Sequence, residues 1–216
     1  MKVIYLFLIT SLILPNFSFC QRGPAISMDY EVPLGSLGEV YKPALNYTLS
    51  HVSIKKKQVW NISLGFYRFE PKENPFIYFN GDETVVAKYS KYSVLPLYIG
   101  LGHNFSISDY ISVQLGMDMG YYYTWYSYSV EGRTSGGVNT INIGGDVIQG
   151  RGDISPKINI LIRLTDIIHL QFRSKFNLFY ALGSQDSESI NYNPYAGSFN
   201  TSTSNGIGLV FLFKKD

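Results

Sequence analysis

The sequence has little charge and almost no cysteine. Charged residues make up 16% of its 216 residues, against the roughly 25% that is typical of soluble domains. Basic residues exceed acidic ones by only two, which excludes a protein that binds nucleic acid by neutralising phosphates. The single cysteine, Cys20, rules out an internal disulfide framework.

Long apolar runs are also missing, except at the N-terminus. The run Val3–Leu14 is shorter than the about 20 residues that a membrane-spanning helix needs. Lys2 precedes this run, and small residues follow it before Gln21, as in a secretory signal peptide. We therefore predict a signal peptide over 1–20 and one domain over 21–216. Attachment of lipid to the cysteine that ends the signal peptide is the alternative.

Aromatic residues and glycine are abundant instead. The chain contains 18 Tyr, 14 Phe and 20 Gly, but only 2 Trp. A high aromatic content combined with low charge argues against both a disordered tail and a coiled coil. The domain after the signal peptide is therefore expected to be folded.

Apolar residues alternate with polar or small ones along most of this domain. A period of two is typical of strands with two different faces. It is clearest over 110–125, where the odd positions from Ile111 to Trp125 are apolar and the even ones include Gln114 and Asp118. Eight strands are expected, near residues 25–32, 44–54, 60–67, 95–102, 110–125, 154–164, 168–178 and 206–213.

Short and long connections alternate between these strands. The short ones lie at 55–57, 106–109 and 165–166, and the long polar or glycine-rich ones at about 33–42, 70–91, 131–152 and 184–201. Hairpins whose two ends face different surroundings have this order. The pattern predicts an all-β fold, an eight-stranded antiparallel up-and-down transmembrane β-barrel with short periplasmic turns and long extracellular loops.

A soluble barrel or a β-sandwich would show the same alternation, with the apolar face as its core. Three features favour the membrane. The face opposite the apolar one consists mainly of small and uncharged polar residues, which suit a narrow lumen, and the strands are long enough to cross a bilayer. Aromatic residues also gather near the strand ends, where they are expected to form girdles at the headgroup levels. These residues are Tyr121, Tyr123, Trp125, Phe211 and Phe213.

A few charged residues of both signs fall on the expected lumenal face. They are Asp29, Glu31, Asp118, Lys157, Arg163, Arg173 and Lys175. Closure of the barrel brings the first strand close to the seventh, and unpaired charges there would carry large desolvation costs. We therefore expect a buried ionic network that plugs the lumen.

Several segments resemble a known family. They are DYEVPLGSLGEVYKPALNYTLS (29–50), LGFYRFEPK (64–72), LPLYIGLGHNF (95–105) and GMDMGYYYTWYSYS (116–129). Together they resemble the porin-like outer-membrane β-barrel domain proteins that are common in Bacteroidetes. The ending over 206–213 resembles the terminal-strand signal that barrel-assembly machinery reads, although Lys214, Lys215 and Asp216 follow it. The resemblance implies an outer-membrane location and an eight-stranded barrel, without a substrate.

Candidate catalytic residues are few. His51 and Ser53 share one strand face, as the base and nucleophile of a lipid-modifying enzyme would, but they adjoin the 55–57 turn on the periplasmic side. We interpret them as solvated edge residues. The three histidines lack metal-ligand spacing, and the tripeptide Arg-Gly-Asp at 151–153 is interpreted as a chance match in a long loop. No catalytic, cofactor-binding or metal-binding residue is predicted.

The sequence thus predicts an exported, integral outer-membrane protein that is not an enzyme and has a structural or loop-mediated interaction role. Its expected partners are outer-membrane lipid, the barrel-assembly machinery during insertion, and a protein that contacts the loops or the periplasmic end. A small transport or pore component, or an accessory subunit of a larger outer-membrane complex, is the alternative. An outer-membrane lipid-modifying enzyme is a third hypothesis.

Overall fold

The computed structural model describes residues 20–181 and 199–214. The predicted signal peptide, apart from Cys20, and most of the fourth long connection lie outside these ranges. The described elements are β1 (Cys20–Leu34), α2 (Gly35–Val40), β2 (Ala44–Lys55), β3 (Gln58–Phe69), β4 (Phe76–Asn80), β5 (Glu83–Tyr89), β6 (Tyr92–Ser106), β7 (Ile111–Thr134), β8 (Asn139–Arg163), β9 (Ile168–Ala181), β10 (Phe199–Phe211) and β11 (Phe213–Lys214). No helix among the described residues is long and apolar enough to span a membrane.

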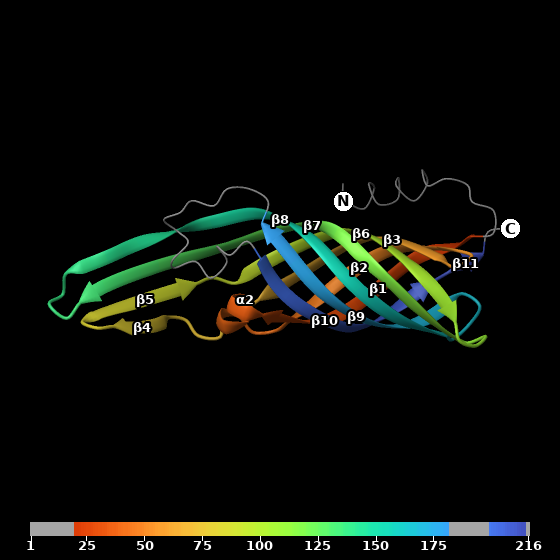
Figure 1. The fold of residues 1–216 in the computed structure, drawn as a ribbon, viewed down its shortest axis with the longest axis horizontal. Coiled ribbons are helices and arrows are strands. Elements are labelled where there is room, and N and C mark those ends of the chain that lie inside the picture. Colours follow the sequence, from red (N-terminus) through yellow and green to blue (C-terminus); the bar gives the residue numbers. More distant parts are fainter. Residues whose placement is uncertain (1–19, 182–198, 215–216) are drawn as a thin grey trace.

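Eight of these strands form a closed antiparallel ring, and they are the eight that the alternation predicted. The order around the ring is β1, β2, β3, β6, β7, β8, β9 and β10. It closes where β10 pairs with β1, with Val210 opposite Ala25. Closure leaves no unpaired strand edge within the ring, which is the condition for a sheet in hydrocarbon. The predicted eight-stranded up-and-down barrel is confirmed (Figure 1).

The apolar face of the strands points outward. On β7, the odd-numbered Leu115 and Met119 are exposed, whereas the even-numbered Gln114 and Asp118 are buried inside the ring. β1 shows the same alternation, with its even-numbered residues outward: Ile26 is exposed, and its neighbours Ala25 and Ser27 are more buried. A band of exposed apolar side chains around a closed ring is the arrangement of a barrel surrounded by lipid.

Two of the predicted long loops are folded as strands instead. The segment 131–152 belongs mainly to β7 and β8, which stay paired from Ile111 opposite Ile162 to Arg133 opposite Asn139. The segment 70–91 contains the hairpin of β4 and β5, and β5 pairs with the outer part of β7. We call this four-stranded extension, made of β4, β5 and the outer parts of β7 and β8, the external sheet.

The external sheet projects well beyond the ring of eight strands (Figure 1). The strands β7 and β8 contain 24 and 25 residues, or about 80 Å of extended chain each. A tilted strand needs only about 9–11 residues to cross the hydrocarbon. Roughly half of each strand therefore lies outside the bilayer, at the end opposite the short turns.

Residue composition explains why these strands were expected to be loops. The segment 139–150 is rich in asparagine and glycine, which are typical of turns. Its apolar positions, Ile141, Ile143 and Val147, nevertheless alternate and pack against a cluster of buried aromatic and apolar side chains. Long-range pairing with β7 therefore outweighs the local preference for turns. The first long connection, 33–42, also differs from a simple loop, because it contains the short helix α2.

Candidate functional site

The interior of the barrel is filled by three layers of side chains. At the periplasmic end lies an apolar floor, formed by Ala25, Val52, Ile54, Val59, Leu161, Val210 and Leu212. A polar and charged layer follows, which we call the ionic layer. An aromatic layer, which we call the ceiling, fills the outer end and continues onto one face of the external sheet. The sequence predicted a polar lumen, so the apolar layers at both ends correct that expectation.

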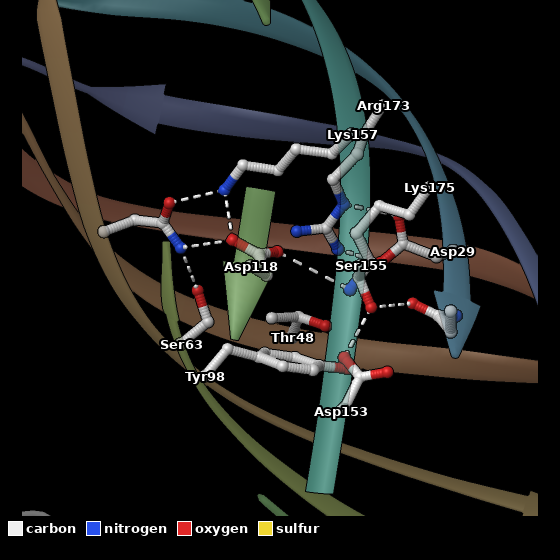
Figure 2. A network of polar contacts seen from close by, with 12 residues as sticks. Asp29, Thr48, Ser63, Tyr98, Asp118, Asp153, Ser155, Lys157, Arg173 and Lys175 are labelled. Carbon is white, nitrogen blue, oxygen red and sulfur yellow. Dashed lines mark hydrogen bonds and ion pairs between the residues drawn. The ribbon is translucent and has the colours of Figure 1, made fainter. Parts of the chain in front are cut away.

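Asp118 of β7 lies at the centre of the ionic layer (Figure 2). Its carboxylate forms an ion pair with the Nζ of Lys157 and lies 3.7 Å from the Nζ of Lys175. Lys157 also donates to Oδ1 of Asn61 at 2.6 Å. The Nζ of Lys175 lies 4.0 Å from the centroid of the Tyr98 ring. The Asp118 carboxylate thus contacts both buried ammonium groups, and the Tyr98 ring provides a second contact for that of Lys175.

Arg173 of β9 binds Asp29 of β1 across the lumen. Its Nε donates to Oδ1 of Asp29 at 3.0 Å, and its Nη2 donates to Oδ2 of the same carboxylate. The Nη2 also donates to the hydroxyl of Ser27 at 2.7 Å. Bidentate pairs of this kind are among the strongest polar contacts in proteins. The contact therefore links the first strand of the ring to the seventh.

Two further carboxylates are held mainly by uncharged donors. Oε1 of Glu31 accepts from Nδ2 of Asn177 at 2.5 Å and from the hydroxyl of Ser202. The hydroxyl of Ser155 donates to Asp153 and lies 2.8 Å from Oδ1 of Asn177. These contacts bring residues of β1, β8, β9 and β10 together at the level between the ionic pairs and the ceiling.

Acidic and basic side chains are equal in number among the buried charged residues of the lumen. The buried acids are Asp29, Glu31, Asp118 and Asp153, and the buried bases are Arg151, Lys157, Arg173 and Lys175. Burial of a charge is costly unless it is paired and hydrogen-bonded. Asp29 and Asp118 meet that condition, because they form ion pairs with Arg173, Lys157 and Lys175.

Six of the seven charged residues that were expected to form the ionic network lie together in the lumen. The exception is Arg163, which lies at the periplasmic end of β8, with 38% of its side chain exposed, and pairs with Asp166 in the following turn. The hydrogen bond from Arg163 lowers the pKa of the Asp166 carboxyl below its usual value. Arg163 is therefore part of the rim and not of the ionic layer.

Sequence reasoning missed Arg151 and Asp153. Both belong to the Arg-Gly-Asp tripeptide that was interpreted as part of a loop, and both side chains are buried in the lumen. Arg151 donates to Oε1 of Gln149 at 3.0 Å. The alternation of the strand could have revealed them, because positions 151 and 153 share one face of β8 with 155 and with Lys157, which was expected in the lumen.

Gly100 of β6 leaves the space that the central ion pair occupies. A Cβ at this position would lie 2.1 Å from Oδ1 of both Asn61 and Asp118, and 2.5 Å from Nζ of Lys157. Any larger residue would collide with all three groups. The absence of a side chain at this position of β6 therefore allows the amide of Asn61 on β3 to meet the charged groups of Asp118 on β7 and Lys157 on β8.

Aromatic rings pack closely in the ceiling. The hydroxyls of Tyr98 and Tyr122 are 2.9 Å apart, and the ring of Tyr122 meets that of Phe179 edge to face with centroids 4.5 Å apart. The helix α2 adds the buried side chains of Leu37 and Val40 to the same cluster. The chain following the first strand thus closes the outer end of the lumen.

The residues expected to form aromatic girdles lie on the outer face. Tyr121, Tyr123 and Phe213 are exposed, and Trp125 and Phe211 are partly exposed. Trp125 stacks on Phe66 of β3, with ring centroids 6.2 Å apart. Tyr121, Tyr123 and Trp125 lie toward the outer end of the barrel, and Phe211 and Phe213 lie at its periplasmic end.

The remaining candidate residues stay apart from the ionic layer. His51 and Ser53 lie on the outer face of β2 near its periplasmic end, since their neighbours Val52 and Ile54 are buried inside. Within the described ranges, no three His, Cys, Asp or Glu residues are placed to hold a metal ion.

A closed eight-stranded ring, an apolar exterior and a filled polar interior together define an integral outer-membrane β-barrel protein. No family model matches the chain, and no curated protein sequence matches it. Similar solved structures exist. Neisserial surface protein A is 9% identical, with 88% of this chain and 96% of that chain covered and a TM-score of 0.53.

Two other solved barrels are more distant. Ail of Yersinia pestis, in complex with the heparin analogue sucrose octasulfate, is 8% identical, with 91% of this chain and 100% of that chain covered and a TM-score of 0.49. The N-terminal barrel domain of OprF from Pseudomonas aeruginosa is 10% identical, with coverage of 88% and 97% and a TM-score of 0.37. At these identities the likeness concerns the fold. The predicted class and the outer-membrane location are confirmed, whereas the Bacteroidetes type is not supported.

Proposed function

We propose that this protein is a closed, non-conducting barrel that anchors the external sheet as an interaction surface outside the cell. The observation that carries the proposal is the combination of a lumen filled along its length with two strands that continue far beyond the membrane. A barrel whose interior is occupied offers no aqueous path. Its exposed part is then the region available for a partner.

The filling of the lumen supports the closed state. The floor, the ionic layer and the ceiling each contain side chains from strands on different sides of the ring. An eight-stranded barrel has an interior just wide enough for its own side chains. The alternative role as a pore component would require all three layers to rearrange.

The external sheet supports an interaction role. One of its faces joins the ceiling cluster, where Val85, Ala87 and Val130 are buried. The opposite face carries exposed apolar side chains, among them Ile77 and Phe79, which is 80% exposed. Exposed apolar residues that lie together outside the membrane are typical of protein-binding surfaces.

We further propose three properties that rest on the sequence alone. They are the absence of an enzymatic role, the membership of the Bacteroidetes type, and the contacts with outer-membrane lipid and the barrel-assembly machinery. The segments quoted above and the strand patterns support them.

The purified protein is expected to give no steady single-channel current in planar lipid bilayers, because no continuous water path crosses its lumen. An outer-membrane porin inserted under the same conditions serves as the positive control for insertion. Steady open-channel currents from the folded protein would show that the lumen opens, and the transport hypothesis would then replace this proposal.

A photo-reactive residue at position 79 is expected to cross-link to a protein outside the barrel when the chain is produced in its native cells. Phe79 lies on the external sheet, whereas Leu97 lies on the outer face of the barrel itself. The same photo-reactive residue at position 97 is the matched control and should yield lipid adducts only. If position 79 gives no protein adduct under these conditions, the external sheet is not an interaction surface.

A further inference from the structure

The outer face shared by β1 and β2 changes from charged to apolar along its length. Near the periplasmic ends, Arg22 of β1 lies opposite Ser53 of β2, and Lys55 lies two residues further along. These side chains point outward, because the alternate positions Ala25, Val52 and Ile54 are buried inside the barrel. The charged residues therefore face the periplasmic headgroup level.

An apolar hollow begins further along the same two strands. Its volume is about 780 Å³. It is lined by residues of β1, β2, β3, β6, β9 and β10, among them Ile26, Met28, Leu49, Phe66, Ile207 and Leu209. Most of its lining is outward-facing and apolar, so the hollow opens toward hydrocarbon. It is large enough for several methylene groups of an acyl chain.

The spacing of the two features lies within one lipid leaflet. Arg22 precedes Ile26 by four residues, and Ser53 follows Leu49 by four residues, which corresponds to about 13 Å along a strand and, with a tilt of about 40°, to about 10 Å of depth. Half of a typical hydrocarbon core measures about 15 Å. A lipid whose headgroup contacts Arg22 and Lys55 would therefore place its acyl chains at the depth of the hollow.

Charge at the periplasmic end favours an anionic headgroup. Among the described residues of that end, the basic ones are Arg22, the lysine turn at 55–57, Arg163 and Lys214, and the acidic ones are Asp109 and Asp166. Basic residues near a membrane surface attract anionic lipids. The excess of basic residues distinguishes this end from the lumen, where acidic and basic side chains are equal in number.

We propose that one anionic glycerophospholipid of the periplasmic leaflet binds along β1 and β2. Its phosphate is held by Arg22 and Lys55, and one acyl chain occupies the apolar hollow. This site is independent of the proposed interaction role, since it lies at the opposite end of the molecule from the external sheet.

The test uses the full-length protein folded in detergent micelles and mixed with palmitoyl-oleoyl phosphatidylglycerol or the matching phosphatidylcholine. Native mass spectrometry then measures how much of each lipid stays bound. The wild type is expected to retain phosphatidylglycerol at least about tenfold better. The double variant Arg22→Gln, Lys55→Gln should lose about 30-fold of that retention, since two basic residues near an anionic lipid are removed. The control variant Lys72→Gln, Lys88→Gln, at the outer end, should behave as the wild type.

A second variant tests the hollow without changing any charge. Leu49→Trp is expected to fill the hollow and to reduce retention of phosphatidylglycerol, while heat-modifiable gel migration shows that the barrel is folded. Equal retention of both lipids by the wild type would overturn the proposal. Unchanged retention by Leu49→Trp would also overturn it, because the lipid would then be part of a general shell around the barrel.

Discussion

Replacing Asp118 with asparagine is expected to lower the free energy of unfolding by about 3–5 kcal/mol, the cost of removing one partner of a buried ion pair. The side chains of Lys157 and Lys175 are 6% and 1% exposed, and both contact this carboxylate. The amide would leave two buried ammonium groups without their shared negative partner. Denaturant unfolding in detergent micelles, followed by the fluorescence of Trp60 and Trp125, measures the difference.

The exposed pair of Arg163 and Asp166 provides the matched control. Asp166 is 81% exposed, and surface pairs contribute only about 0–1 kcal/mol. Asp166→Asn should therefore change the free energy of unfolding by less than about 1 kcal/mol. If the two substitutions have equal effects, the ionic layer is hydrated and does not have the tight packing described here.

Replacing Tyr122 with alanine is expected to cost about 3–5 kcal/mol, as for other large aromatic residues in packed cores. Its side chain is 1% exposed and contacts both Tyr98 and Phe179. The conservative Tyr122→Phe keeps the ring contacts and loses only the hydrogen bond to Tyr98, for which about 1 kcal/mol is expected. Unfolding in micelles again gives the comparison.

Tyr123, the next residue along the chain, provides the control that distinguishes the effect of burial in the ceiling from that of contact with lipid. Tyr123 is 42% exposed on the outer face of the same strand. Tyr123→Ala removes a lipid contact without opening a cavity in the lumen, so its effect should be clearly smaller than that of Tyr122→Ala. An equal or larger effect at position 123 would contradict the assignment of the two faces.

The ring of eight strands could be predicted from the sequence because parity is a local property. From Ile111 to Met119, the alternation of apolar with polar or small residues shows which face meets lipid and which meets the lumen, and no knowledge of the partner strands is needed. The approach of Asp29 to Arg173 followed from closure of the ring, since closure alone brings β1 near β9. The structure has both residues in contact across the lumen.

Other features depend on partners that the local sequence does not indicate. The segment 139–150 resembles a loop in composition, and only pairing with β7 makes it a strand. Arg151 and Asp153 were missed for the same reason, because they follow this segment and were assigned to the same loop. Tyrosine added a second difficulty, because a ring with one hydroxyl suits a polar lumen, a lipid interface and an aromatic core alike. Tyr98, Tyr122 and Tyr126 all lie in the ceiling.

The unbroken course of β7 and β8 determines how the molecule would bear a mechanical load. A pull on the tip of the external sheet, directed along these strands, loads in shear the ladders of hydrogen bonds that join β7 to β6 and β8 to β9 within the ring. The bonds then resist together and do not open one after another, as they do when a strand is peeled from its edge. The tip of the sheet is thus tethered to the cell envelope as firmly as the transmembrane strands themselves.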